Sequence, residues 1–152
     1  MENTANNNKT ISLVLAIVKL VLAVVFLVFT FFVPAEADGE IQISLFFLFQ
    51  LYLAEFHPFL PLFILFLLVT LLVIIKNILL LVGVLKDKDV IALTKANISS
   101  SLILASIFYF VISAILGFYN TFHPYVALVL LVAYTIVKKI LEKKLNIGRK
   151  KK

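Results

Sequence analysis

Four apolar stretches set the strongest limit on what this chain of 152 residues can fold into. They lie near residues 11–33, 58–80, 98–118 and 121–141, and each is long enough as a helix to cross a bilayer core of roughly 30 Å. Hydrophobic residues make up 63% of the chain, against about 45–50% in soluble domains. We therefore predict an all-α fold, an integral membrane four-helix bundle whose membrane domain covers residues 11–141.

Basic residues are distributed unevenly around these stretches. The segments between the first and second stretches, and between the third and fourth, contain no Lys or Arg. Positive charge near the ends of spans stays on the cytoplasmic side. Both termini are therefore predicted to be cytoplasmic, in a multi-pass protein of the cell membrane. Residues 1–10 are predicted to form a disordered cytoplasmic tail, and residues 142–152 a basic one.

The first apolar stretch is too long for a signal peptide. Ala35-Glu36-Ala37 has the composition of a cleavage site, but the run from 11 to 33 exceeds the roughly 7–15 residues of a signal-peptide core. We predict a retained span. Lys19 and Lys76 lie in the cytoplasmic halves of their spans, and we expect both side chains to snorkel toward the membrane surface.

The segment 34–57 forms the only long outer connection. Its apolar part, residues 41–53, is too short to span as a helix and is partly polar, so we predict an interfacial or re-entrant segment in this first outer loop. The alternative is the outer half of a longer second span, although Pro58 and Pro61 favour a break. Its aromatic residues suit the bilayer interface: Phe46, Phe47, Phe49, Tyr52 and Phe56.

Two histidines precede prolines at the predicted outer face, in Phe56-His57-Pro58-Phe59 and Phe122-His123-Pro124-Tyr125. Together with Glu55, His57 and His123 are candidates for a zinc or copper site or for a pH-sensitive gate. Metal sites usually need three or four ligands, and no fourth is evident. We therefore favour the simpler interpretation, in which these histidines cap helices that begin with proline, and we predict no metal site and no cofactor.

The third stretch carries a seam of small polar residues. Ser99, Ser106 and Ser113 recur every seven residues, and Tyr109 and Gly117 fall on nearly the same helical face. Such a seam either lines a water-filled path or lets helices approach closely and form hydrogen bonds. We favour close packing.

Eight of the fourteen basic residues fall within residues 138–152, at the end of the last stretch and beyond it. We interpret them as attracted to the anionic inner leaflet of the bilayer rather than to nucleic acid. They are Lys138, Lys139, Lys143, Lys144, Arg149, Lys150, Lys151 and Lys152.

Catalytic motifs are missing from the sequence. The absence of cysteine excludes disulfides and thiol chemistry, and no Gly-rich phosphate loop, zinc-protease motif or nucleophile elbow occurs. Every Asp and Glu lies outside the apolar stretches, so the carboxylate relay usual in proton-coupled carriers is missing too. We predict that the protein is not an enzyme and has no catalytic residues.

Two charged elements, Leu85-Lys-Asp-Lys-Asp89 and Val137–Asn146, follow the second and fourth stretches. With the long first outer loop, this layout resembles a widespread uncharacterised family of small bacterial four-span membrane proteins. The Cys-free, Asn- and Lys-rich composition also resembles that of low-GC Gram-positive bacteria, in which small basic membrane proteins accompany bacteriocin peptides. That resemblance implies an immunity or transport accessory, by analogy.

Two functions follow as hypotheses. The first is a non-enzymatic membrane protein that acts through helix association with a membrane-protein partner, a peptide or a second copy of itself. The alternative is a small oligomeric transporter or channel whose path is lined by the third span.

Overall fold

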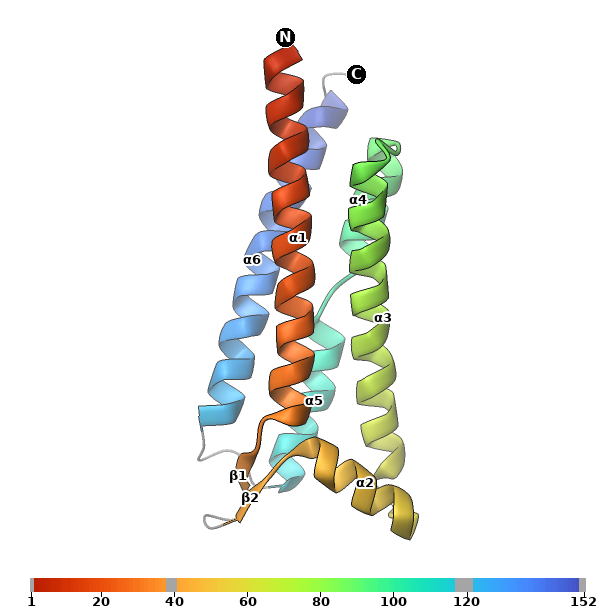
Figure 1. Cartoon of the computed structure of the whole chain (residues 1–152), viewed down its shortest axis with the longest axis vertical. Coiled ribbons are helices and arrows are strands. Elements are labelled where there is room, and N and C mark those ends of the chain that lie inside the picture. Colours follow the sequence, from red (N-terminus) through yellow and green to blue (C-terminus); the bar gives the residue numbers. More distant parts are fainter. Residues whose placement is uncertain (1, 38–40, 117–121, 151–152) are drawn as a thin grey trace.

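The computed structural model describes residues 2–37, 41–116 and 122–150, and within them it contains six helices and one short β-hairpin (Figure 1). In chain order these are α1 (Glu2–Phe32), β1 (Ala35–Ala37), β2 (Ile41–Ile43), α2 (Leu45–Glu55), α3 (Leu60–Leu85), α4 (Val90–Ser99), α5 (Ile103–Leu116) and α6 (Phe122–Lys150). The two chain ends lie at the same end of a long bundle, which we call the termini end (Figure 1). The hairpin and α2 lie at the opposite end, the hairpin end.

Four helical segments are long and apolar enough to cross a membrane. They are Lys9–Phe32, Leu60–Leu85, Val90–Leu116 and Phe122–Leu145. The prediction of four spans packed as a helical bundle is thus confirmed, and the architecture is that of a multi-pass membrane protein. The third span differs from the expected single helix, because it consists of α4 and α5 in succession.

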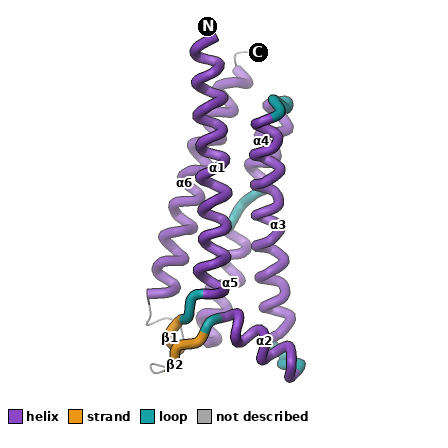
Figure 2. Tube along the Cα trace, viewed as in Figure 1, coloured by secondary structure: helices purple, strands orange, loops and turns teal. Residues whose placement is uncertain are grey.

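The third span lies across the bundle from α1. Helix α1 packs mainly against α3 and α6, while α4 packs between α3 and α6 in the half near the termini. Helix α5 takes the corresponding place in the half near the hairpin. The break between α4 and α5 is therefore enclosed by α1, α3 and α6 (Figure 2).

Two separate apolar clusters fill the interior. The cluster of the hairpin half includes Phe26, Phe66 and Tyr109, and the smaller cluster of the termini half is built around Leu80 and Leu141. Lipid tails are as apolar as these side chains, so close packing rather than the hydrophobic effect holds the helices together. Polar side chains occupy the space between the two clusters, as described below.

The aromatic-rich segment is a helix of its own. The Ser44 hydroxyl caps α2 by accepting a hydrogen bond from the backbone N–H of Phe47 (3.1 Å), and Phe56 ends it in a left-handed conformation with φ of 51°. Helix α3 then begins with Pro61 in its first turn. Helix α2 is thus not part of the second span; it runs obliquely across the hairpin end and contacts α1 and α3 (Figure 1).

A short hairpin joins α1 to α2, which the sequence analysis did not predict. Strands β1 and β2 pair antiparallel, with Ala35 opposite Ile43 and Ala37 opposite Ile41. The pairing satisfies backbone groups of the two strands themselves. The hairpin turns the chain back and starts α2 at the hairpin end of the bundle.

Helical structure extends into both predicted tails. Helix α1 begins at Glu2, and α6 continues to Lys150. No proline or glycine interrupts residues 2–10, so a helix nucleated in the apolar span propagates into them at small cost. The Lys9 ammonium also forms an ion pair with Asp87 (2.9 Å), which joins α1 to the turn between α3 and α4.

Candidate functional site

The third span is interrupted at residues 100–102, inside the bundle. Neither glycine nor proline lies there, and the local signal is the run Ser99-Ser100-Ser101, whose hydroxyls compete with helical backbone bonding. An interruption frees the last carbonyls of α4 and the first N–H groups of α5. In hydrocarbon each freed group must find a partner within the protein.

Five polar side chains surround this interruption, and we call them the polar layer. Each is 0–1% exposed, and together they come from all four spans. The polar layer lies between the two apolar clusters and separates the cluster of the termini half from the cluster of the hairpin half. The members are Lys19, Asn77, Asn97, Ser100 and Tyr134.

Lys19 reaches the interruption from α1. Its ammonium donates a hydrogen bond to the Ser100 hydroxyl and makes a longer contact with the Asn97 carbonyl oxygen (3.5 Å). The same nitrogen lies 5.3 Å from the centre of the Tyr134 ring, within cation–π range. The carbonyl end of α4 is the negative end of its dipole, so an ammonium placed there is stabilised.

Two further carbonyl oxygens at the interruption accept hydrogen bonds from two other helices. The Tyr134 hydroxyl of α6 donates to the Ser100 carbonyl oxygen and accepts from Asn77 Nδ2 of α3 (2.8 Å). The half-buried Lys76 donates to the Ser99 carbonyl oxygen (3.2 Å). Because no proline or glycine enforces the interruption, these contacts from other helices maintain it.

Two acceptors in the layer have no hydrogen-bond partner among the described residues. They are the side-chain oxygens of Asn77 and Asn97, both in fully buried residues. The amide nitrogens are in use: Asn77 Nδ2 also donates to the Val73 carbonyl (2.8 Å), and Asn97 Nδ2 donates to the Lys138 carbonyl (3.1 Å). The layer thus holds more oxygen acceptors than its own donors occupy.

The expected snorkelling of Lys19 is wrong. Its side chain is fully buried and turns to the interior of the bundle, where the ammonium contacts the Asn97 carbonyl oxygen and the Ser100 hydroxyl. Lys76 likewise bonds to one of these carbonyls. The sequence signal for such a site was present in the intramembrane lysines and in Asn77 and Asn97, but the interruption that brings them together was not predicted.

The serine seam of the third span is divided by the same interruption. Ser106, Tyr109 and Ser113 of α5 are buried inside the bundle. Ser99 is exposed and its hydroxyl donates to the Ala96 carbonyl (3.2 Å), because α4 and α5 do not continue one helical face. Gly117 lies outside the described residues.

The two histidines have different surroundings. His123 is buried: its Nδ1 bonds to the Tyr109 hydroxyl, and its Nε2 lies 3.0 Å from each of the Phe29 and Val33 carbonyl oxygens. Since carbonyls only accept, Nε2 carries the proton and, in the neutral ring, Nδ1 accepts from Tyr109. The imidazole therefore links α5 and α6 to the end of α1.

His57 instead makes local contacts. Its Nδ1 accepts from the backbone N–H of Phe59 (3.2 Å), its ring stacks on Tyr52 at 4.0 Å, and the neighbouring Glu55 is exposed. Within the described ranges, no group of three or more His, Asp or Glu side chains is arranged to hold a metal ion. The structure does not bring Glu55, His57 and His123 together as such a group.

The predicted lipid-binding residues lie along α6 at the termini end. Lys139 and Lys143 are exposed, whereas Lys138 and Lys144 are half-buried. Arg149 and Lys150 belong to the end of α6, and residues 151–152 lie outside the described part of the chain.

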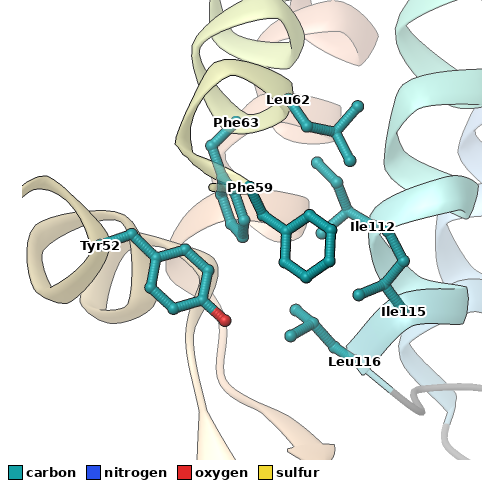
Figure 3. Close-up of a pocket in the computed structure, with 7 residues that line it drawn as sticks. All are labelled: Tyr52, Phe59, Leu62, Phe63, Ile112, Ile115 and Leu116. Atoms are coloured by element: carbon teal, nitrogen blue, oxygen red, sulfur yellow. The ribbon is translucent and has the colours of Figure 1, made fainter. Parts of the chain in front are cut away.

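An apolar hollow opens between the end of α2, the start of α3 and the end of α5 (Figure 3). Its empty volume is about 180 Å³, including space open to the outside, whereas ligand pockets usually have about 300–1,000 Å³. The Tyr52 hydroxyl is the one polar side-chain group among the residues that line it: Tyr52, Phe59, Leu62, Phe63, Ile112, Ile115 and Leu116. It offers little to orient a ligand, so the polar layer is the stronger candidate site.

No protein-family model matches the chain, and neither a curated protein nor a solved structure is significantly similar to it. The resemblance drawn from the layout of the sequence therefore holds for architecture alone. Four long apolar helices indicate a small four-span membrane protein, and no family is identified.

Proposed function

We propose that the protein is a small, non-enzymatic transporter or channel that moves an ion or a small polar solute past the polar layer. The observation that carries this proposal is the interruption of the third span at a buried polar layer. Discontinuous helices near the bilayer midplane supply unwound carbonyls and helix ends to substrate and ion sites in many transporters. A bundle with a purely structural role has no need of a buried ammonium at such a place.

The interruption is also suited to movement. Its carbonyls are held by side chains from α1, α3 and α6 and not by a proline kink. Exchange of those side-chain partners changes the relation of α4 to α5 without breaking either helix. A transport cycle needs such an element with two arrangements.

The proposed orientation places the termini end in the cytoplasm. The support for it is the clustering of basic residues: Lys9 and the turn containing Lys86 and Lys88 belong to this end, and Lys139 and Lys143 project from α6 near it. The proposed role of that basic surface is contact with anionic lipid of the inner leaflet.

Flux measurements on purified protein in liposomes test the transport function. Protons, alkali cations and halides are assayed in separate experiments, with empty liposomes as the baseline. We expect flux of at least one ion class, reduced at least tenfold in the Ser100→Ala variant. The Leu128→Ala variant is the control, because Leu128 is exposed on α6. Flux no higher than in empty liposomes for every ion class contradicts the proposal.

Association with a second copy or another membrane protein is the second candidate function. It is favoured by the low burial of the spans, because only 22–39% of the residues in the most apolar part of each are buried within one copy. Of the serine seam that suggested a partner, Ser106 and Ser113 are buried within the bundle and Ser99 is exposed. Cross-linking in native membranes tests this function: a species of monomer mass alone contradicts it.

A further inference from the structure

The chemistry of the polar layer indicates which class of ion it would accept. Its acceptors are the carbonyl oxygens of Asn97 and Ser100, the Ser100 hydroxyl and the side-chain oxygens of Asn77 and Asn97. All of these oxygens are uncharged. They resemble the ligands that surround a partly dehydrated alkali cation where a helix is unwound.

Neutral oxygens at the end of a helix discriminate between ion classes. Protein sites for divalent cations usually include carboxylate ligands, and the layer contains none. At the acceptor oxygens themselves an anion is disfavoured, because they lie at the carbonyl end of α4, where the helix dipole is negative; the positive end of α5 lies on the other side of the interruption. A monovalent cation meets both conditions, and the Lys19 ammonium is itself a monovalent cation in contact with these oxygens.

We propose that the polar layer is a binding site for one monovalent cation, and that the ammonium of Lys19 is the cation that occupies it in this structure. On this proposal, which rests on the transport function proposed above, a potassium, sodium or ammonium ion enters the layer when Lys19 leaves it. The Lys19 ammonium, which is tethered to α1, then competes with the ion for the layer. Each exchange replaces one positive charge with another, so the buried layer holds a single positive charge throughout.

The position of Lys19 fits this role. Helix α1 packs mainly on α3 and α6, so the Lys19 side chain is one of few links from α1 to the third span. Its withdrawal removes the ammonium from the Ser100 hydroxyl oxygen and from the Asn97 carbonyl oxygen, while the Ser100 hydroxyl still donates to that carbonyl (2.9 Å). The side-chain oxygens of Asn77 and Asn97 lie in the same buried layer without a hydrogen-bond partner among the described residues, and on this proposal they turn toward the incoming ion.

Removal of the ammonium tests the site without any measurement of transport. Lys19→Ala protein is purified in mild detergent, and its thermal midpoint is compared in N-methylglucamine, sodium, potassium and ammonium chlorides at equal ionic strength. We expect at least one of the three small cations to raise the midpoint by about 3–6 °C when its concentration is about ten times its dissociation constant. The wild-type protein, whose own ammonium fills the site, should shift by less than about 1 °C.

Lys76→Ala is the matched control. Lys76 also bonds to a carbonyl of the interruption, but its position is half-buried. This variant should therefore show no preference for sodium, potassium or ammonium over N-methylglucamine. Addition of Ser100→Ala to the Lys19→Ala variant should abolish the cation response, because a ligand of the ion is removed.

The proposal is overturned if the Lys19→Ala midpoint is the same in all four salts, or if calcium stabilises this variant more than any monovalent ion does. Lys19→Met, which retains the apolar stem, is the second variant if Lys19→Ala does not fold. Failure of both variants to fold in every salt also overturns it, since a small cation is expected to replace the ammonium. A cation response without flux by the wild-type protein removes the transport function and leaves the site, whereas halide flux without a cation response does the reverse.

Discussion

The hydroxyl of Tyr134 is the most informative single group to remove. It donates to the Ser100 carbonyl at the interruption and accepts from the side-chain amide of Asn77. Tyr134→Phe deletes this oxygen and keeps the ring, so the packing and the ring face toward Lys19 are preserved. The variant therefore measures the hydrogen bonds without creating a large cavity.

The expected cost follows from the groups that are left behind. The Ser100 carbonyl loses its Tyr134 donor in a fully buried position, which costs about 1–3 kcal/mol. The Asn77 amide keeps its bond to Val73 and loses about 0.6 kcal/mol, the average for hydrogen bonds between membrane helices. We expect a total decrease of about 2–3 kcal/mol in the free energy of unfolding.

Reversible unfolding in mixed micelles, followed by circular dichroism, measures this decrease. Tyr125→Phe is the control on the same helix: Tyr125 is 62% exposed, and its variant should lie within about 0.5 kcal/mol of wild type. Addition of Asn77→Ala completes a double-mutant cycle, in which we expect a coupling of at least about 0.5 kcal/mol. Equal stability of the Tyr134 and Tyr125 variants would refute the hydrogen-bonded layer.

Three further predictions concern other parts of the bundle. His123→Ala should lower the free energy of unfolding by about 2–4 kcal/mol, because its buried partners on α1 and α5 lose their hydrogen bonds. His57→Ala should lower it by less than about 1 kcal/mol. The same unfolding assay measures both variants, and an equal loss of stability in the two contradicts the different surroundings of the histidines. Phe56→Gly should raise stability by about 0.5–1 kcal/mol, since Phe56 is 85% exposed and has a φ of 51°, and a lower thermal midpoint counts against the left-handed cap. Lys9→Ala should cost about 0.2–1 kcal/mol and only at low salt, because its ion pair with Asp87 is exposed; a loss unchanged in high salt contradicts that assignment.

The spans were predictable from sequence because lipid imposes a simple requirement on each of them separately. Apolar length alone places the four helices, and the prolines at 58 and 61 separate α2 from α3. The hairpin left only a weak signal, the dipeptide Asp38-Gly39 between short stretches of residues that form strands. Such a hairpin is easily overlooked beside long apolar helices.

The polar layer was not predictable in the same way, because its partners are far apart in sequence. Lys19 and Ser100 are separated by 81 residues, and Asn77 and Tyr134 by 57. A lysine in a membrane span is expected to extend its side chain toward the aqueous surface. The acceptors that bind Lys19 inside the bundle become available only because the third span is interrupted. The predicted seam of Ser99, Ser106 and Ser113 likewise assumes a continuous helix, whereas Ser99 lies in α4 and the other two serines lie in α5.

Solid-state NMR on the protein in lipid bilayers tests the central claim most directly. With ¹⁵N-labelled lysine and ¹³C-labelled backbone, we predict helical chemical shifts up to Ser99 and again from Ile103, non-helical shifts at 100–102, and a dipolar contact between Lys19 Nζ and Ser100. Continuous helical shifts through 100–102, together with a Lys19 ammonium that exchanges with water, would contradict the account.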